Sequence, residues 1–182
     1  MRSFRRLGAL ALASPLLADD VVEFHAARLL LLIATCGIKG RITGLTKLAK
    51  LDFFVRYPQF FDEACRKTMA GVGSAARGVE SSMIRFKYGP WDHRYYQVLP
   101  YLEGLGLISV EESEKSIELS ITSEGQRIAA LLAQQSAFAE LVDQIRRVGG
   151  VFGRKSGSSL KKLIYKLFQN EVVNRQFGEV IY

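Results

Sequence analysis

The amino-acid sequence predicts a mainly helical fold with one small β-hairpin. Apolar residues recur at helical spacing through most of the chain. Two short apolar segments flank a polar turn at residues 111–116, which is the pattern of a hairpin. The composition, 48% hydrophobic and 24% charged, is that of an ordinary globular protein. The 182 residues are enough for one domain with its own core and appended helices.

The first two helices are predicted from their end signals. Acidic residues open a helix over residues 20–36, and Gly37 is placed to end it as a C′ residue. Thr43 is expected to cap a second helix over residues 44–57.

Proline and glycine divide the next part of the chain. Pro58 should interrupt the second helix, and a shorter helix is expected over residues 59–67. Small residues and glycines at 70–79 predict a flexible loop. Residues 82–88 alternate with a period of two, which predicts a short strand.

A further helix is expected from Asp92, a good N-cap, to Glu103. Pro100 should kink or restart this helix, and Gly104 and Gly106 should end it. The hairpin then pairs residues 107–110 with residues 117–121. Thr122 should cap the helix that follows the hairpin. Two more helices are predicted at residues 138–148 and 160–173, with a linker at residues 149–159.

The step from helix to hairpin is the most informative motif. The sequence YLEGLGLI at residues 101–108 precedes the hairpin, and ITSEG at residues 121–125 follows it. Glycine permits the sharp helix-to-strand turn, and the aliphatic residues bury the base of the hairpin. This order of elements favours a winged helix-turn-helix with additional N- and C-terminal helices. The alternative is a helical domain with an incidental hairpin.

On this basis the chain divides into three parts. We expect an N-terminal arm, a winged helix-turn-helix domain and a basic, helical C-terminal extension, at residues 1–19, 20–135 and 136–182.

Charge is distributed unevenly within the net charge of +7. Residues 1–56 carry nine Lys/Arg and four Asp/Glu, residues 57–145 carry eight and twelve, and residues 146–182 carry eight and two. Such asymmetry suggests a polyanion or an acidic protein as a partner for the basic ends. The alternative is a set of solvated cations that serve solubility.

No pattern in the sequence supports catalysis or metal binding. Cys36 and Cys65 lie in dissimilar settings without a CxxC pair, and His25 and His93 are not spaced as ligands. We expect buried thiols. No nucleophile–base arrangement and no phosphate-binding glycine loop occurs. We therefore expect no enzymatic activity, no cofactor and no small-molecule substrate.

The N-terminus allows two interpretations. Three arginines precede an apolar run at residues 7–17, which superficially resembles a signal peptide. The region that would be cleaved has no clear small-x-small pair, which favours an N-terminal arm or an over-long start on a cytoplasmic protein. The apolar run at residues 29–36 is too short to span a bilayer.

Two stretches resemble a known family. They are KLAKLDFFVRYP at residues 47–58 and MIRFKYGPWDHRYY at residues 83–96. Both resemble the middle components of bacterial three-component ABC-ATPase conflict systems, which are similar to the small third subunit of Lamassu-type anti-phage systems. The resemblance covers residues 24–130. It implies a winged-helix subunit that links an SMC-like ABC ATPase to an effector, often a nuclease.

Arginines and aromatic residues cluster in the second stretch, and such residues anchor protein interfaces. The predicted partner-binding residues are Arg85, Lys87, Trp91, His93, Arg94 and Tyr95. In the alternative interpretation, Trp91 and Tyr95 belong to the core and Arg94 pairs with Asp92 or Glu103.

Contact with double-stranded DNA is a further expectation, because lysine and arginine neutralise phosphates. The predicted DNA-binding residues are Lys47, Lys50, Arg56, Arg154, Lys155, Lys161, Lys162 and Lys166. The C-terminal cations could instead bind an acidic protein surface. A stand-alone winged-helix transcription regulator is the alternative function. Its recognition helix would present Trp91, Asp92, His93 and Arg94, which suit the reading of base edges poorly.

Overall fold

The computed structural model describes residues 21–68, 83–86, 89–113, 116–169, 178 and 180–181, with the side chains of residues 84–86 excepted. Its helices are α1 (Val22–Cys36), α2 (Leu45–Arg56), α3 (Pro58–Thr68), α4 (Tyr95–Gly104), α5 (Ser123–Ala133), α6 (Ala139–Phe152) and α7 (Gly157–Leu167), with a short 3-10 helix at Ser136–Phe138. Its strands are β1 (Arg41–Thr43), β2 (Met83–Phe86), β3 (Gly89–Trp91), β4 (Ile108–Ser113), β5 (Ser116–Ile121) and β6 (Val180–Ile181). The fold is mainly helical with little β-structure, as the sequence predicts.

The strands form two small antiparallel sheets. In the first sheet, β5 lies between β1 and β4. Leu119 of β5 is opposite Ile42 of β1 on one side and opposite Val110 of β4 on the other. The hairpin of β4 and β5 is longer than the sequence predicted. In the second sheet, β2 lies between β3 and β6. The expected strand at residues 82–88 is therefore the central strand of this sheet.

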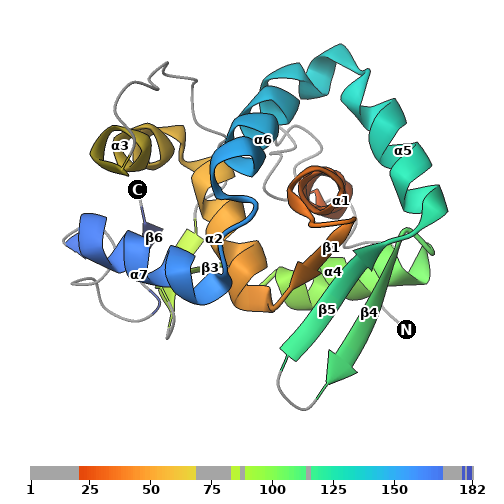
Figure 1. Cartoon of the computed structure of the whole chain (residues 1–182). Coiled ribbons are helices and arrows are strands. Elements are labelled where there is room, and N and C mark those ends of the chain that lie inside the picture. Colours follow the sequence, from red (N-terminus) through yellow and green to blue (C-terminus); the bar gives the residue numbers. More distant parts are fainter. Residues whose placement is uncertain are drawn as a thin grey trace, which may run out of the picture.

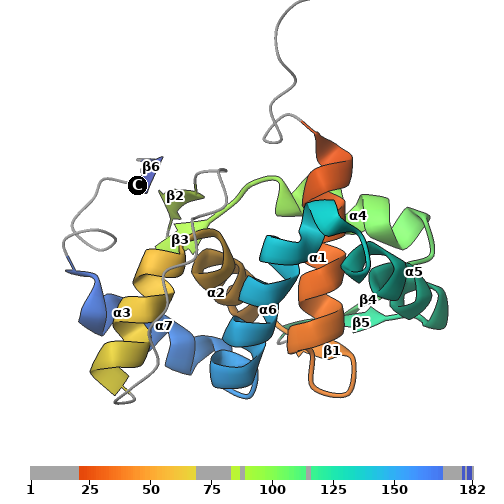
Figure 2. The same cartoon turned by 90° about the horizontal axis from the view of Figure 1, so that it is seen from above.

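Two helices occupy the centre of the molecule. Residues 29–33 of α1 are buried, and α4, α5 and α6 pack around this helix (Figure 1). Helix α2 lies beside α1 and is covered by α6, α7 and β3, as Figure 2 shows from above. The C-terminal helices α6 and α7 thus complete the same core as α1 and α2. No helix of the described segments is both long and apolar enough to cross a membrane.

Aromatic side chains fill the core between α2, α3, α6 and α7. The rings of Phe54 and Phe152 lie 4.7 Å apart, and those of Phe60 and Phe168 lie 4.8 Å apart. These separations are typical of tilted and edge-on aromatic pairs, which stabilise a core beyond their buried area. The aromatic contacts join the C-terminal helices to α2 and α3.

The ends of α1 and α2 differ from the sequence prediction. Gly37 has a φ of −68° and is not left-handed. It is required for space, because a Cβ there would lie 2.5 Å from the carbonyl oxygen of Ile33. Thr43 does not cap α2 but ends β1, and Gly44, with a φ of 91°, precedes the helix.

The step from α4 into the hairpin follows the prediction. The N–H of Gly106 donates to Glu103 O, and the N–H of Leu107 donates to Leu102 O. With a φ of 69° at Gly106, this is a Schellman ending. The helix continues through Pro100, so the predicted restart there is wrong. Thr122 caps α5 by accepting a hydrogen bond from Gly125 N at 2.9 Å.

The predicted linker at residues 149–159 is helical over much of its length. Helix α6 continues to Phe152, and α7 begins at Gly157. The glycines that suggested a loop permit close packing instead. A Cβ at Gly149 would lie 3.1 Å from Cys36 Sγ, and one at Gly157 would lie 2.9 Å from Lys47 N. The glycine content of a segment gives no information on such contacts, because they join residues that are far apart in the sequence.

Two lysines of α2 are buried under the elements that cover this helix. Lys47 Nζ donates to Gly153 O at 2.7 Å, and Lys50 Nζ donates to Pro90 O at 2.8 Å. Lys50 has no exposed surface. Burial, and secondarily the positive charge of Lys161, lower the pKa of Lys50 from 10.5 to about 7.

The burial of Lys50 predicts a pH-dependent stability. Between pH 7 and 10.5 the unfolded chain holds the Lys50 proton more firmly than the folded chain does. The free energy of unfolding should therefore rise with pH, by at most about 1.4 kcal/mol per unit from this group. Lys50→Met lacks this contribution, so its stability relative to the wild type should fall as pH rises from 7 to 10. Urea unfolding at several pH values measures the difference.

Lys162→Met, which removes an exposed ammonium group from α7, is the matched control. If the difference in the free energy of unfolding between Lys50→Met and the wild type stays constant from pH 7 to 10, the pKa of Lys50 is not lowered in the folded chain.

Candidate functional site

The predicted partner-binding segment is partly a core segment. Trp91 and Tyr95 are 5% and 1% exposed, and their rings meet edge to face with centroids 5.5 Å apart. The prediction that they contact a partner is therefore wrong, and the alternative that they belong to the core is confirmed. His93 is exposed and Arg94 is partly buried, so partner binding by these two stays a prediction. The side chains of Arg85 and Lys87 lie outside the described residues.

Beneath the start of α4, Asp52 of α2 is fully buried among donors. Arg28 Nε donates to Asp52 Oδ1 at 2.9 Å, and the Tyr95 hydroxyl donates to Asp52 Oδ2 at 2.7 Å. Arg56 NH1 lies 3.5 Å from Asp52 Oδ2. Helices α1, α2 and α4 thus meet at a single carboxylate.

Asp92 joins this network at the entry to α4. Its carboxylate accepts hydrogen bonds from Arg56 NH1 at 2.8 Å, from Arg94 Nε at 2.9 Å and from the backbone N of Arg94 at 2.9 Å. Burial raises the pKa of Asp92, but the Arg94 hydrogen bonds and the Arg56 charge outweigh it and lower the pKa to about 2. Asp92 is therefore ionised at neutral pH, and it holds the chain before α4, but the N-cap of α4 is Arg94, so the predicted helix start at Asp92 is wrong.

His25 connects the two guanidinium groups at the edge of the network. Its Nδ1 lies 2.8 Å from Arg28 NH1, and its Nε2 lies 3.0 Å from Arg94 NH1. A neutral imidazole has only one acceptor nitrogen, so only one of these guanidinium groups can donate to the ring. We name the set His25, Arg28, Asp52, Arg56, Asp92, Arg94 and Tyr95 the buried ion network.

The buried ion network is suited to holding α4 rather than to acid–base chemistry. The oxygens of both carboxylates already accept from guanidinium or hydroxyl groups at 2.7–3.1 Å. A general base must instead offer a free acceptor to its substrate. The network therefore fixes the orientation of α4 relative to α1 and α2.

The structure corrects the predicted DNA contacts on α2. Lys47 is 6% exposed, Lys50 has no exposed surface and Arg56 is 1% exposed. Side chains buried to this degree cannot reach a DNA backbone, so the prediction is wrong for all three. The apolar stripe of α2 suggested a polar outer face, but neighbouring elements cover the helix on that side as well.

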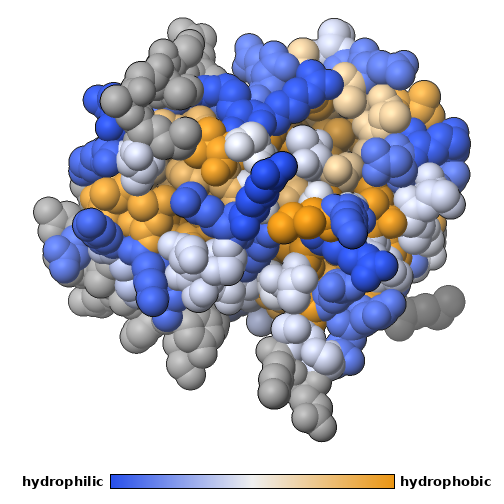
Figure 3. Space-filling view, viewed as in Figure 1, coloured by the Kyte–Doolittle hydropathy of each residue, from blue (hydrophilic) through white to orange (hydrophobic). Residues whose placement is uncertain are grey.

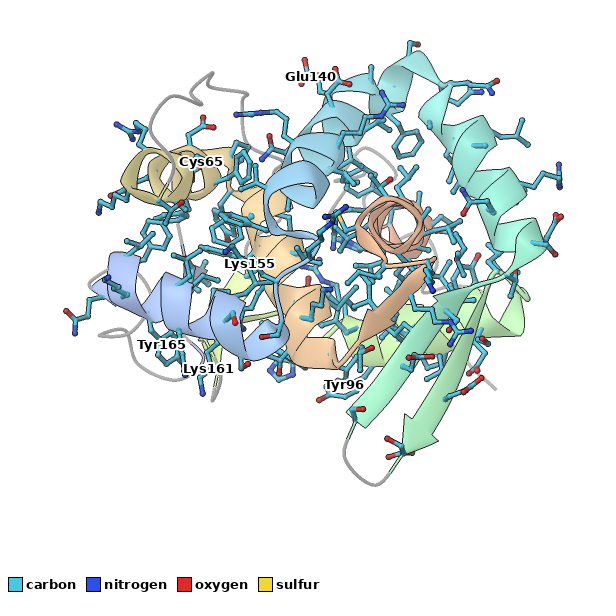
Figure 4. All side chains as sticks on the ribbon, in the orientation of Figure 1. Cys65, Tyr96, Glu140, Lys155, Lys161 and Tyr165 are labelled. Atoms are coloured by element: carbon cyan, nitrogen blue, oxygen red, sulfur yellow. The ribbon has the colours of Figure 1, made fainter. Side chains whose placement is uncertain are left out.

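The C-terminal cations are placed differently. Arg154, Lys155, Lys162 and Lys166 are exposed, and Lys161 is partly buried with its Nζ 5.4 Å from the centroid of the Tyr165 ring. Figure 4 labels Lys161 and Tyr165 below α7 and Lys155 above it, near the turn from α6. Arg154 and Lys155 lie in the short turn between α6 and α7. DNA binding by these five residues stays a prediction.

Three large hydrophobic side chains are exposed on α4 and at its C-terminal end, where the sequence analysis did not place them. Tyr96 is 63% exposed, Tyr101 38% and Leu105 53%. The same segment carries exposed glutamates on α4 and β4, namely Glu103, Glu111 and Glu112, and Glu103 Oε1 accepts from Val110 N at 3.0 Å. We call these six residues the α4–hairpin surface. Helical spacing from the buried Tyr95 could have placed Tyr96 and Tyr101 on the outer side of α4.

The thiols are buried, as predicted. Cys36 and Cys65 are both free, and burial raises the pKa of Cys36 to about 12 against a smaller opposing effect of Lys47. A thiol with so high a pKa is unreactive at neutral pH. Among the described residues, no group of three or more His, Cys, Asp or Glu side chains is arranged to hold a metal ion.

Comparisons of the chain with protein-family models, with curated proteins and with solved structures find no match.

Removing one charge from the buried ion network should be strongly destabilising. Asp52→Asn preserves shape but leaves Arg28 and Arg56 facing a neutral group in the core. We expect the free energy of unfolding to fall by about 3–5 kcal/mol, the usual effect of breaking a buried pair. Chemical denaturation followed by circular dichroism measures it.

Glu118→Gln is the control, because Glu118 pairs with the exposed Arg41 at 3.2 Å. An exposed pair contributes at most about 1 kcal/mol. An equal, small effect of the two substitutions would contradict the structural role of the buried ion network.

Proposed function

We propose that this chain is a non-catalytic winged-helix subunit of a bacterial three-component anti-phage complex of the Lamassu type, and that it docks a protein partner through the α4–hairpin surface. The observation that carries the docking proposal is the chemistry of that surface. It combines exposed Tyr96, Tyr101 and Leu105 with carboxylates and without lysine or arginine.

The winged-helix assignment is supported by the order and pairing of the elements. Helix α1, strand β1 and helix α2 precede α4 and the hairpin, and β1 pairs with β5 to complete a three-stranded sheet. In this assignment α4 corresponds to the third helix and the hairpin to the wing. One departure is that residues 57–94, with α3, β2 and β3, stand where a helix-turn-helix has only a short turn.

The charge of the α4–hairpin surface favours a protein partner over DNA. Residues 95–121 contain five glutamates and one lysine. A winged-helix regulator inserts this part of the fold into the major groove, where phosphates would repel such a surface. Protein interfaces, by contrast, are enriched in tyrosine, and hot-spot residues lie in desolvated apolar centres. The chemistry thus disfavours the stand-alone transcription regulator.

The same chemistry defines what the partner must offer. A complementary patch would hold apolar pockets for Tyr96 and Tyr101, ringed by lysine or arginine for the glutamates. The family resemblance of residues 47–58 and 83–96 implies an SMC-like ABC ATPase and an effector as companions. We assign the docking role to the ATPase, because it is the component that the middle subunit links to the effector.

Truncating the exposed tyrosines should break the complex. The double variant Tyr96→Ala, Tyr101→Ala removes two exposed aromatic side chains from α4 without touching the buried ion network. The loss of two interface anchors is expected to cost about 2 kcal/mol or more, at least roughly a 30-fold weaker affinity. The test is co-expression with the products of the neighbouring genes, among which the proposal expects an SMC-like ATPase, followed by size-exclusion chromatography and calorimetric titration.

Leu131→Ala, which truncates a comparably exposed side chain on α5, is the matched control and should assemble normally. Wild-type chain that elutes alone in the presence of the ATPase would refute the subunit proposal. A complex that survives the double tyrosine substitution would place the interface elsewhere. Selection of a single DNA sequence by the isolated chain would support the regulator instead.

A further inference from the structure

The outer side of α7 carries a second surface of opposite charge. From residue 144 to residue 170 the chain has seven lysines and arginines and no aspartate or glutamate. Five of these cations are exposed: Arg146 lies on α6, and the other four, Arg154, Lys155, Lys162 and Lys166, lie on α7 or in the turn before it. Within the part of the chain that the structure describes, none of the four forms an ion pair with a carboxylate.

Helical spacing explains why the cations lie together. Leu160 and Ile164 point into the core and have no exposed surface. The opposite side of α7 presents exposed polar side chains only, namely Ser158, Ser159, Lys162 and Lys166. Lys162 and Lys166 are one helical turn apart, so their side chains are neighbours.

The turn from α6 extends this surface. Arg154 and Lys155 are exposed immediately before Ser156, which caps α7 by accepting from Ser159 N at 3.1 Å. Figure 3 shows hydrophilic side chains over the α6–α7 turn, near the centre of the view. We call Arg154, Lys155, Ser158, Ser159, Lys162 and Lys166 the basic α7 surface.

The composition of the basic α7 surface fits a phosphate backbone better than a protein. None of the exposed large hydrophobic side chains found in the described residues lies on α7 or in the α6–α7 turn. Protein interfaces are depleted in lysine and need apolar anchors, which this surface lacks and the α4–hairpin surface has. Lysine, arginine and serine are the side chains that hold DNA phosphates.

We propose that the basic α7 surface binds the phosphate backbone of double-stranded DNA without reading its sequence. All side chains of this surface can donate a hydrogen bond, and no carboxylate interrupts them. Four of these residues belong to α7, which packs against α2, and Arg154 and Lys155 precede this helix in the turn from α6. The inference is independent of the docking proposal, because it concerns a different surface and a different class of partner.

The number of cations sets the expected salt dependence. Four cations that each neutralise one phosphate give a slope of log K against log salt of about −3.6. Binding should therefore weaken by about 100-fold between roughly 50 and 200 mM salt. Two cations fewer should reduce the slope to about −1.8.

The test is fluorescence anisotropy of a labelled duplex of random sequence, titrated with the full chain at both salt concentrations. The variant Lys162→Glu, Lys166→Glu should bind at least ~10-fold more weakly and show the smaller slope. The control Arg127→Glu, Arg146→Glu changes the net charge equally, at exposed positions on α5 and α6, and should bind as the wild type does. Circular dichroism and thermal unfolding establish that both variants are folded.

Three outcomes would overturn the proposal. The first is no saturable binding by the wild type at ~100 µM protein in low salt, the weak limit of non-specific binding. The second is an equal loss of affinity in the two variants, which would reflect net charge rather than this surface. The third is unchanged DNA affinity of Lys162→Glu, Lys166→Glu with loss of the ATPase complex, which would make α7 a protein contact.

Discussion

The orientation of α4 depends on two buried carboxylates. Asp52 and Asp92 accept from three arginines and one tyrosine that come from α1, α2 and the start of α4. Burying so many charges is unfavourable unless each is paired, so the arrangement has little tolerance for misplacement. A core of leucines alone would allow α4 to rotate or slide. The buried ion network instead allows one position, and the hairpin follows α4 through the glycine turn at Gly106.

This constraint determines which residues α4 can offer to other molecules. Because the Tyr95 hydroxyl donates to Asp52 and the Trp91 ring packs on Tyr95, both rings lie in the interior and are not available to a partner. Tyr96 and Tyr101 are then turned outward by helical geometry. The segment between residues 91 and 96 therefore combines core and surface roles at adjacent positions. A cluster of aromatic residues in a sequence cannot by itself show which of its members are exposed.

Local signals in the sequence predicted some helix ends correctly, although the Thr43 cap and the restart at Pro100 were wrong. The site was predicted poorly because its contacts join distant segments. The Thr122 cap and the glycine ending of α4 depend on residues within one turn of each other, and both were predicted. The roles of Lys47, Lys50 and Arg56 depend on Gly153 at the end of α6, on Pro90 of β3 and on Asp92, which are 36 or more residues away in the chain. A lysine off the apolar stripe of a helix usually faces water. Here Lys47 and Lys50 instead donate hydrogen bonds to backbone carbonyl groups of the segments that cover α2. No local sequence pattern predicts such a contact.

The same burial changes the meaning of the net charge of +7. Three cations of α2 are buried inside the protein and are not available to a partner, whereas the four cations of the basic α7 surface are exposed. The α4–hairpin surface is acidic, and it lies on the other side of α2 from α7 (Figure 1). A polyanion attracted to α7 is repelled by the glutamates of the hairpin, since like charges repel over about 8–10 Å at physiological salt. DNA on one surface would therefore leave the other free for a protein, and one small chain could hold both at once.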